Sequence, residues 1–232
     1  MHVFITGVSS GIGLAFLNHF LAENATITGI GRTQPDVQGN YSFLRCELAN
    51  LNEVNSLSLK SNDSEILLIN NAGTIGTIQR VSSQEISDIE EVMIVNSITP
   101  MCFCQKILQE NPGKKITILN ISSGAANRAI PSWAAYCSSK IALDRFSETI
   151  QLEEDEKNTK TRVFSVAPGV VDSKMQEKIR QRSLLDFSSV NNFVELHSNG
   201  ELLDPKFVVN KLVKLLFDST KTRVIYSIKD LN

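Results

Sequence analysis

Short apolar runs alternate along the chain with longer stretches in which apolar residues recur every three or four positions. The short runs are typical of buried strands, and the longer stretches are typical of helices with one buried face. The predicted strands are residues 2–6, 25–30, 42–45, 66–69, 116–121, 162–166 and 223–227. The predicted helices are residues 11–23, 50–60, 85–110, 132–156, 173–180 and 205–218. This alternation predicts a doubly wound α/β fold, in which helices cover both faces of a seven-stranded parallel sheet.

Composition and charge narrow the class of protein. The 232 residues are 42% hydrophobic and 21% charged, which suits one α/β domain spanning residues 1–232. A net charge of −2 gives no electrostatic basis for binding nucleic acid or a membrane surface. No apolar run approaches the roughly 20 residues of a membrane span, and no basic leader precedes the first strand. We therefore expect a cytoplasmic protein that acts on a small molecule.

The four cysteines give no metal-binding pattern. Cys102 and Cys104 form a Cys-x-Cys pair, but no second pair and no histidine stands at metal-ligand spacing. We expect Cys46, Cys102, Cys104 and Cys137 to be buried free thiols, and we expect no metal site.

A glycine-rich segment follows the first predicted strand and opens the first predicted helix. It carries Gly7, Gly11 and Gly13, with Ser9, Ser10 and Ile12 between them. Glycines at this junction permit a tight turn and a close approach of the backbone to a pyrophosphate, which the N-terminus of the helix would attract. Alone, the motif also fits an ordinary glycine-containing turn, but with the residues described next it predicts a Rossmann-type dinucleotide site.

A second constellation lies in residues 123–140. Tyr136 and Lys140 are four residues apart and share one face of a predicted helix. An ammonium near a phenol favours the phenolate, so we expect Lys140 to lower the pKa of Tyr136 toward neutrality. Ser123 is placed to hydrogen-bond a carbonyl oxygen that Tyr136 protonates. The alternative for Tyr136 and Lys140 alone is an exposed helix face.

Together these motifs resemble the short-chain dehydrogenase/reductase family. Gly7, Gly11 and Gly13 match its cofactor motif; Asn70-Asn71-Ala72-Gly73, Asn96 and Pro168-Gly169 match further motifs in family order. The resemblance implies a catalytic set of Asn96, Ser123, Tyr136 and Lys140, in which Asn96 holds a water that passes protons to Lys140. It also implies that a nicotinamide cofactor is held by Gly7, Ser9, Ser10, Gly11, Ile12, Gly13, Arg32, Thr33, Glu47, Leu48, Asn71, Ala72, Gly73, Tyr136, Lys140, Pro168, Gly169, Val171 and Ser173.

The end of the second predicted strand indicates which nicotinamide cofactor is used. NAD-binding members of such folds carry an acidic residue here, which binds the ribose hydroxyls. This chain has Gly31 followed by Arg32, and an arginine can bind a 2′-phosphate through paired charged hydrogen bonds. We therefore predict NADP(H), the alternative being that Arg32 is an exposed loop cation. Glu47 stands where the family usually has an aspartate beside the adenine.

Within the family, the chain resembles the sepiapterin reductases and the bacterial benzil-type diketone reductases. Residues 133–137, 151–154, 167–176 and 199–204 carry this likeness. The aspartate by which sepiapterin reductases bind the pterin corresponds to Ile228, with Asp230 two residues later. The resemblance thus implies an NADPH-dependent carbonyl reductase acting on a small ketone or 1,2-dicarbonyl rather than on a pterin.

The substrate would bind between the nicotinamide and a partly helical, mobile lid from about residue 172 to about residue 204. We expect Ser123, Tyr136, Trp133 and Met175 to contact it, with Phe187 as a further apolar candidate. Plain packing is the alternative for Trp133, Met175 and Phe187.

Two other functions remain open at this stage, namely a non-catalytic NADP(H)-binding redox sensor and an NAD-dependent alcohol dehydrogenase. Family members usually pair through the helices that here cover about residues 85–110 and 132–156, which implies a homodimer or homotetramer.

Overall fold

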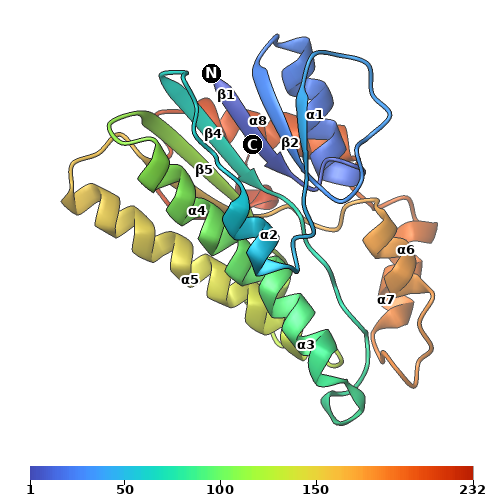
Figure 1. The fold of residues 1–232 in the computed structure, drawn as a ribbon. Coiled ribbons are helices and arrows are strands. Elements are labelled where there is room, and N and C mark those ends of the chain that lie inside the picture. The colour runs from blue at the N-terminus through green and yellow to red at the C-terminus, as the bar shows by residue number, and fades with distance from the viewer. Residues whose placement is uncertain (232) are drawn as a thin grey trace.

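The computed structural model describes residues 1–231, and it contains one parallel sheet with helices on both faces (Figure 1). The strands are β1 (His2–Thr6), β2 (Thr26–Gly31), β3 (Ser42–Arg45), β4 (Glu65–Asn70), β5 (Lys115–Ile121), β6 (Arg162–Ala167) and β7 (Ile225–Ser227). They pair in the order β3-β2-β1-β4-β5-β6-β7, and every pairing is parallel. The predicted fold class is confirmed.

The helices are α1 (Gly11–Ala22), α2 (Leu51–Ser56), α3 (Ile86–Met93), α4 (Thr99–Glu110), α5 (Ala134–Glu156), α6 (Lys174–Arg180), α7 (Val190–Ser198) and α8 (Pro205–Phe217). Figure 1 shows α1 and α8 on one face of the sheet and α4 and α5 on the other. Within residues 1–231, no helix combines the length and the apolarity that crossing a membrane requires.

The sheet buries a separate apolar cluster on each face, as the twofold alternation of strand side chains requires. Val3 and Ile5 of β1 belong to the cluster under α1 and α8, which includes Phe16 of α1. Phe4 belongs to the opposite cluster, which includes Phe103 of α4. Both faces of β1 are thus covered, which explains why this strand is a continuous apolar run in the sequence.

The prediction of a helix over residues 50–60 is wrong for its second half, because α2 ends at Ser56 and the backbone is extended at Leu57. The carboxylate of Glu110, at the end of α4, accepts hydrogen bonds from the backbone N–H of Leu59 and the hydroxyl of Ser58, both at 2.7 Å. Leu59 is fully buried. A contact between distant segments therefore draws the chain out of the helix at this point.

The predicted helix over residues 85–110 contains a π-helical turn, Ile94–Ile98, between α3 and α4.

The cysteines are free thiols as predicted. Cys46 and Cys104 are buried, whereas Cys102 and Cys137 are only half-buried. In the predicted lid, α6 matches the helix expected over residues 173–180, and α7 adds a second helix.

Buried amides connect the sheet to α5, the helix that carries Tyr136 and Lys140. Asn70 of β4 donates to the side-chain oxygen of Asn120 in β5 at 2.8 Å. The amide nitrogen of Asn120 in turn donates to the hydroxyl of Ser147 in α5, also at 2.8 Å. Because a buried polar group is costly when unpaired, this chain of bonds favours one register of α5 against the sheet.

The turn between β1 and α1 brings backbone against backbone. Gly7 and Gly11 have positive φ angles of 73° and 55°, a region that glycine adopts without strain. A Cβ atom on Gly13 would lie 2.1 Å from the carbonyl oxygen of Gly7. The glycine spacing read from the sequence therefore reflects two different needs, which are positive φ at Gly7 and Gly11 and the absence of a side chain at Gly13.

Replacing Gly13 by alanine is expected to destabilise the fold by about 1–3 kcal/mol or more, because the new methyl group collides with an immobile backbone oxygen. Gly124→Ala is the matched control, since a Cβ there would meet nothing within 4 Å. Urea unfolding followed by circular dichroism measures both changes. Equal stability of the two variants would contradict the close approach of α1 to Gly7.

Candidate active site

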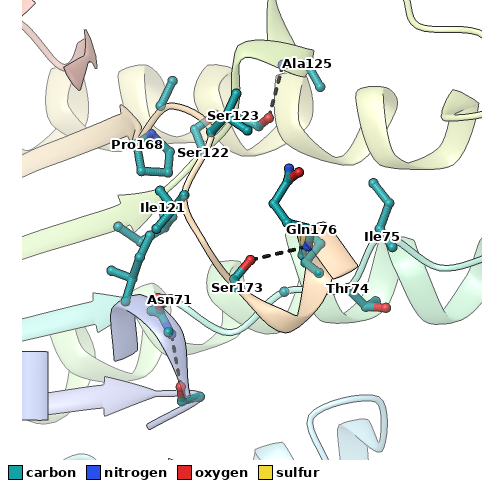
Figure 2. Close-up of a pocket in the computed structure, with 18 of the residues that line it drawn as sticks. Asn71, Thr74, Ile75, Ile121, Ser122, Ser123, Ala125, Pro168, Ser173 and Gln176 are labelled. Carbon is teal, nitrogen blue, oxygen red and sulfur yellow. Dashed lines mark hydrogen bonds between the residues drawn. The ribbon is translucent and has the colours of Figure 1, made fainter. Parts of the chain in front are cut away.

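A cavity of about 1200 Å³ opens along the carboxyl ends of the strands. Its wall is contributed by the turn after β1, the ends of β2 and β3, the loops after β4, β5 and β6, and helices α5, α6 and α7. Figure 2 shows part of this wall, where Asn71, Ser123 and Pro168 come from three different loops and Gln176 comes from α6. This edge is where open parallel α/β sheets bind ligands.

Most of the residues predicted for the site line this one cavity. Those proposed for the cofactor are Gly7, Ser9, Ser10, Gly11, Ile12, Arg32, Thr33, Glu47, Leu48, Asn71, Ala72, Gly73, Tyr136, Lys140, Pro168, Gly169, Val171 and Ser173. Those proposed for catalysis or substrate contact are Ser123, Tyr136, Lys140, Trp133 and Met175.

Three predicted residues lie behind the wall instead. Gly13 is buried against the turn, where its role is the close packing described above. Asn96 is fully buried in the π-helical turn. Phe187 is fully buried and stacks on Trp133 with ring centroids 5.2 Å apart, so it supports the wall by packing.

The start of α1 has the features of an anion site. Ser10 occupies the N-cap position, but its side chain makes no capping hydrogen bond. The caps of α2, α6 and α8 are closed by the side chains of Asn50, Ser173 and Asp204, whereas α3, α5 and α7, like α1, have no side-chain cap. The first N–H groups of α1 therefore remain available toward the cavity, with the positive end of the helix dipole behind them. A Cβ on Gly7 would lie 2.9 Å from Ala72, which keeps this part of the wall tight.

Tyr136, Ser123 and Lys140 come together at the other end of the cavity. Burial raises the pKa of Tyr136, and the neighbouring Ser123 hydroxyl only partly opposes this rise. The ammonium of Lys140 lies 5.8 Å from the centroid of the Tyr136 ring and donates to the carbonyl oxygen of Ile121 at 2.8 Å. The pKa of Tyr136 is therefore raised in this structure and does not fall toward neutrality as expected, because loss of water around the phenol dominates.

Burial also lowers the pKa of Lys140, to about 8, while the carboxyl of Asp144 opposes that shift. Asp144 lies one helical turn along α5 and accepts a hydrogen bond of 2.6 Å from Ser165 of β6. Its own pKa is raised by burial, while the hydrogen bond from Ser165 and the charge of Lys140 oppose this rise. Beside the candidate proton donor, Lys140 is thus still mostly charged at pH 7 and becomes neutral as the pH rises through about 8.

The π-helical turn directs Asn96 toward the loop after β4. Its amide oxygen accepts from the backbone N–H of Thr74, and its amide nitrogen donates to the carbonyl of Thr74, both at 2.8 Å. The amide nitrogen also donates to the hydroxyl of Ser139 in α5 at 3.1 Å. A Cβ on Gly73 would lie 3.3 Å from the Asn96 oxygen and 3.7 Å from Lys140 Nζ. Asn96 therefore fixes the loop that passes under Lys140, and glycine leaves the space between them open.

At the far end of the cavity, Arg32 forms an exposed ion pair with Glu47, whose charged atoms are 3.6 Å apart. Glu47 also accepts from the backbone N–H of Ala49 at 3.3 Å. Gly31 lines the wall beside Arg32, so no side chain comes between the end of β2 and the cavity. A phosphate bound to Arg32 would have to compete with the carboxylate of Glu47.

Apolar side chains form much of the wall around Tyr136. Trp133 and Met175 were predicted among them from the sequence, whereas Ile75, Ile130, Phe193 and Leu196, which line the same region, were not. Trp133 packs edge-on against Tyr136, with ring centroids 5.6 Å apart. Gln176 of α6 is also buried in the wall and was not predicted from the sequence. Its spacing of three residues from Ile179, which puts both on one helix face, was the only available signal.

Lys140→Met is expected to change the pH dependence of stability. Because folding lowers the pKa of Lys140 from 10.5 to about 8, the buried ammonium costs the native state free energy below about pH 8. This cost disappears as the pH rises toward 10.5, where the lysine is neutral in both states. The Tm of Lys140→Met relative to wild type should therefore be more favourable at pH 7 than at pH 10.

Differential scanning calorimetry at the two pH values measures this difference. Lys160→Met is the control, since its ammonium is exposed to water in the folded protein. A relative Tm of Lys140→Met that is the same at both pH values would show that the ammonium is not desolvated in the folded protein.

Comparisons with known proteins find similar sequences and a similar fold. The family model for short chain dehydrogenases matches residues 1–184. A benzil reductase ((S)-benzoin forming) from Bacillus subtilis is 34% identical over 237 residues, covering 97% of each chain. A sepiapterin reductase from Bos taurus is 33% identical over 156 residues, covering 65% of this chain and 57% of its own.

The solved structure of the KRED1-Pglu enzyme has a TM-score of 0.84 to this chain, covering 97% of this chain and 99% of its own. At 24% identity this likeness concerns the fold. The family match and the benzil reductase likeness, which extends over nearly the whole sequence, decide the classification. The chain belongs to the short-chain dehydrogenase/reductase family.

Proposed function

We propose that this protein is an NADPH-dependent carbonyl reductase that acts on a small ketone or 1,2-dicarbonyl, with Tyr136 as the proton donor. The observation that carries the proposal is the single cavity that runs from the glycine turn at the start of α1 to Tyr136, Ser123 and Lys140. One end of this cavity fits a pyrophosphate. At the other end, the hydroxyl groups of Tyr136 and Ser123 can both hydrogen-bond a carbonyl oxygen. The 34% identity to a benzil reductase over the whole chain supports the substrate class.

The part of the cavity that runs from Arg32 past the glycine turn to Lys140 fits a dinucleotide. The uncapped start of α1 and the glycine turn suit the pyrophosphate, and Arg32 suits a 2′-phosphate. Gly31, in place of a carboxylate, removes the group that would repel this phosphate. Gly73 leaves space beside Lys140 for a ribose. NADP(H) is therefore the cofactor that we assign to the site.

When bound, the reduced nicotinamide supplies a hydride to the carbonyl carbon of the substrate. Tyr136 donates its phenolic proton to the carbonyl oxygen, and burial favours the protonated form that this step requires. The Ser123 hydroxyl donates a hydrogen bond to the same oxygen as negative charge develops there. The Ser123 oxygen itself accepts from the backbone N–H of Ala125 at 3.1 Å, which orients the hydroxyl.

Lys140 stabilises the phenolate that Tyr136 becomes after it donates its proton. Its pKa of about 8 lets it exchange protons with water near neutral pH, which suits the return of the tyrosine to its protonated form. Asn96 acts as a positioning residue, because its three hydrogen bonds tie the loop after β4 to α5.

The substrate end of the cavity supports an apolar dicarbonyl over a pterin. Ile228, at the position of the pterin-binding aspartate of sepiapterin reductases, lines the wall. Asp230 accepts from the backbone N–H of Ser227 at 2.8 Å and lies 3.7 Å from Arg223, so its carboxylate serves the chain itself. With Ile75, Ile130 and Phe193, the wall suits aromatic or alkyl substituents.

We further infer a homo-oligomer that pairs through α4 and α5. Ile141 and Leu152 of α5 are more than half exposed, at 56% and 64%. Exposed apolar side chains on a long helix support pairing with a second copy.

Tyr136→Phe is expected to lower kcat for reduction of benzil by about 10²–10⁴-fold, because it removes the proton donor and leaves the cavity intact. NADPH binding should be retained. Stopped-flow and steady-state measurements of NADPH absorbance give the rate, and Tyr41→Phe is the control, since Tyr41 does not line the cavity. Reduction by Tyr136→Phe at the wild-type rate would exclude Tyr136 as the acid. Tight NADPH binding by wild type without turnover of any carbonyl would favour a redox sensor.

Arg32→Ala is expected to weaken NADPH binding about tenfold and to leave NADH binding nearly unchanged, because only NADPH carries the 2′-phosphate. Glu47→Gln should strengthen NADPH binding, since the carboxylate no longer competes for Arg32. Titration of NADPH fluorescence measures both dissociation constants. Arg145→Ala is the control, because it breaks another exposed Arg–Glu pair outside the cavity. Equal losses for NADPH and NADH in Arg32→Ala would contradict the assignment of the phosphate site.

A further inference from the structure

Asp144 of α5 is a carboxylic acid buried behind the wall of the cavity. Its side chain does not line the cavity, and the residue is only 8% exposed. Ionisable groups are rarely buried to this extent unless an opposite charge or hydrogen bonds replace the lost water. The groups that surround Asp144 therefore indicate why it is there.

A hydrogen bond from the sheet holds this carboxyl group in place. The hydroxyl of Ser165, which is fully buried in β6, donates to Asp144 Oδ1 at 2.6 Å. Hydrogen bonds from a hydroxyl to an ionised carboxylate are typically about 2.5–2.7 Å long and shorter than those between neutral groups. Ser165 is fixed in turn, because its backbone N–H donates to the carbonyl oxygen of Val224 at 2.9 Å. The geometry thus fits an ionised Asp144 held rigidly against the sheet.

The cation nearest along the helix is Lys140, one turn before Asp144. Residues four apart on a helix lie on the same face, and both of these are buried, with Lys140 only 4% exposed. Within residues 1–231, neither side chain takes part in an ion pair. The two groups therefore interact across a short gap. Burial lowers the pKa of Lys140 to about 8, and the charge of Asp144 opposes that shift.

The other charged groups around α5 are engaged elsewhere or lie at a distance. Arg145 and Glu148 of α5 pair with each other at 3.0 Å on its exposed side. The short turn after β5 and the π-helical turn, which both pack against α5, contain no titratable residue. Lys115 and Arg162 are the first residues of β5 and β6, at the amino ends of these strands. The remaining titratable groups lie on α3 and α4, namely Asp88, Glu90, Glu91, Cys102, Cys104, Lys106 and Glu110.

We propose that Asp144 is the buried counter-charge that keeps Lys140 an ammonium during reduction and thereby acts as a positioning residue. The inference rests on the proposed carbonyl reductase function, because Asp144 would act on the reaction only through Lys140. A neutral Lys140 would stabilise the phenolate of Tyr136 less than an ammonium does. The carboxylate of Asp144 therefore extends the reaction to higher pH.

The gap between the two charges suits this role better than direct contact would. Lys140 donates one hydrogen bond to the carbonyl oxygen of Ile121, and an ammonium has two further N–H groups. A carboxylate in contact with Lys140 would take up these groups. Asp144 instead bonds Ser165 and leaves them for the phenolate and the cofactor ribose. In a buried environment, charges that are not in contact still interact appreciably.

The pH dependence of kcat/KM for benzil at saturating NADPH tests this role. At high pH the rate falls as Lys140 loses its proton, and burial keeps the Tyr136 phenol from ionising first. Asp144→Asn removes the charge and nearly keeps the shape, so this alkaline limb should move to lower pH by about one unit. Asp144→Glu keeps the charge and should leave the limb near its wild-type position. Glu156→Gln is the control, since Glu156 lies exposed at the end of α5.

The shifted limb is a signature that a packing defect does not produce. At the midpoint of the wild-type limb, the shift should cost Asp144→Asn about fivefold in kcat/KM, whereas two pH units lower it should cost almost nothing. A loss of packing alone would lower the rate by the same factor at every pH. An alkaline limb that stays in place in folded Asp144→Asn would overturn the role of Asp144.

Stability gives a readout that is independent of turnover. Differential scanning calorimetry compares Lys140→Met, Asp144→Asn and the double variant at pH 7 and pH 10. At pH 7, Asp144→Asn leaves a buried ammonium without its counter-charge, so the Tm change of the double variant should be more favourable than the sum of the two single changes. At pH 10, Lys140 is neutral in the folded protein, and the changes should add. Additive changes at both pH values would overturn the pairing.

The outcomes separate this role from the proposed function. If wild type reduces benzil but neither the alkaline limb nor the Tm changes respond as described, the role of Asp144 is overturned and the carbonyl reductase remains. If wild type reduces no carbonyl but the Tm changes at pH 7 do not add, the proposed function fails. The task of Asp144 in reduction fails with it, while its charge pairing with Lys140 stands.

Discussion

Hydrogen bonds between the carboxyl ends of β1 and β4 hold open the crevice on which the rest of the site depends. The hydroxyl oxygen of Thr6 accepts from the backbone N–H groups of Asn71 and Ala72, both at 3.0 Å. The amide of Asn71 donates to the carbonyls of Thr6 and Gly7 at 3.0 and 3.1 Å. The sheet grows in opposite directions from these two strands, so their connections leave to opposite sides and a gap remains between them. These four bonds fix the glycine turn and the loop through Gly73 as the two sides of that gap.

The end of the cavity at Tyr136 keeps polar groups in places from which water is excluded. Tyr136, Lys140 and Asp144 are all buried, and burial shifts the pKa of each in the direction that favours the neutral form of the side chain. The two apolar clusters on the sheet faces provide the stability that permits this arrangement. A phenol that stays protonated and a lysine that titrates near neutral pH suit proton donation better than a pair of permanent charges would.

Features that follow from a local pattern of residues were predicted from the sequence, and features that depend on contacts between distant residues were missed. All seven strands were predicted within two residues of their bounds, because strands covered on both faces are continuous apolar runs. The end of α2 was missed because Glu110, far along the chain, captures the backbone at Leu59. The direction of the Tyr136 pKa shift was wrong because a spacing of four residues shows proximity to Lys140 but not the loss of water. Gln176 was missed for the same reason, since its burial depends on where α6 rests.

The order of strands in the sheet has a kinetic consequence. β1 lies between β2 and β4, and the cavity that begins at Gly7 is completed near the other end of the chain by Ile228. Every strand pairing is parallel, so each closes a long loop of chain before its contacts are gained, and such topologies fold slowly. The cavity, whose wall combines residues from both ends of the chain, is therefore complete only once these slow, non-local pairings have formed.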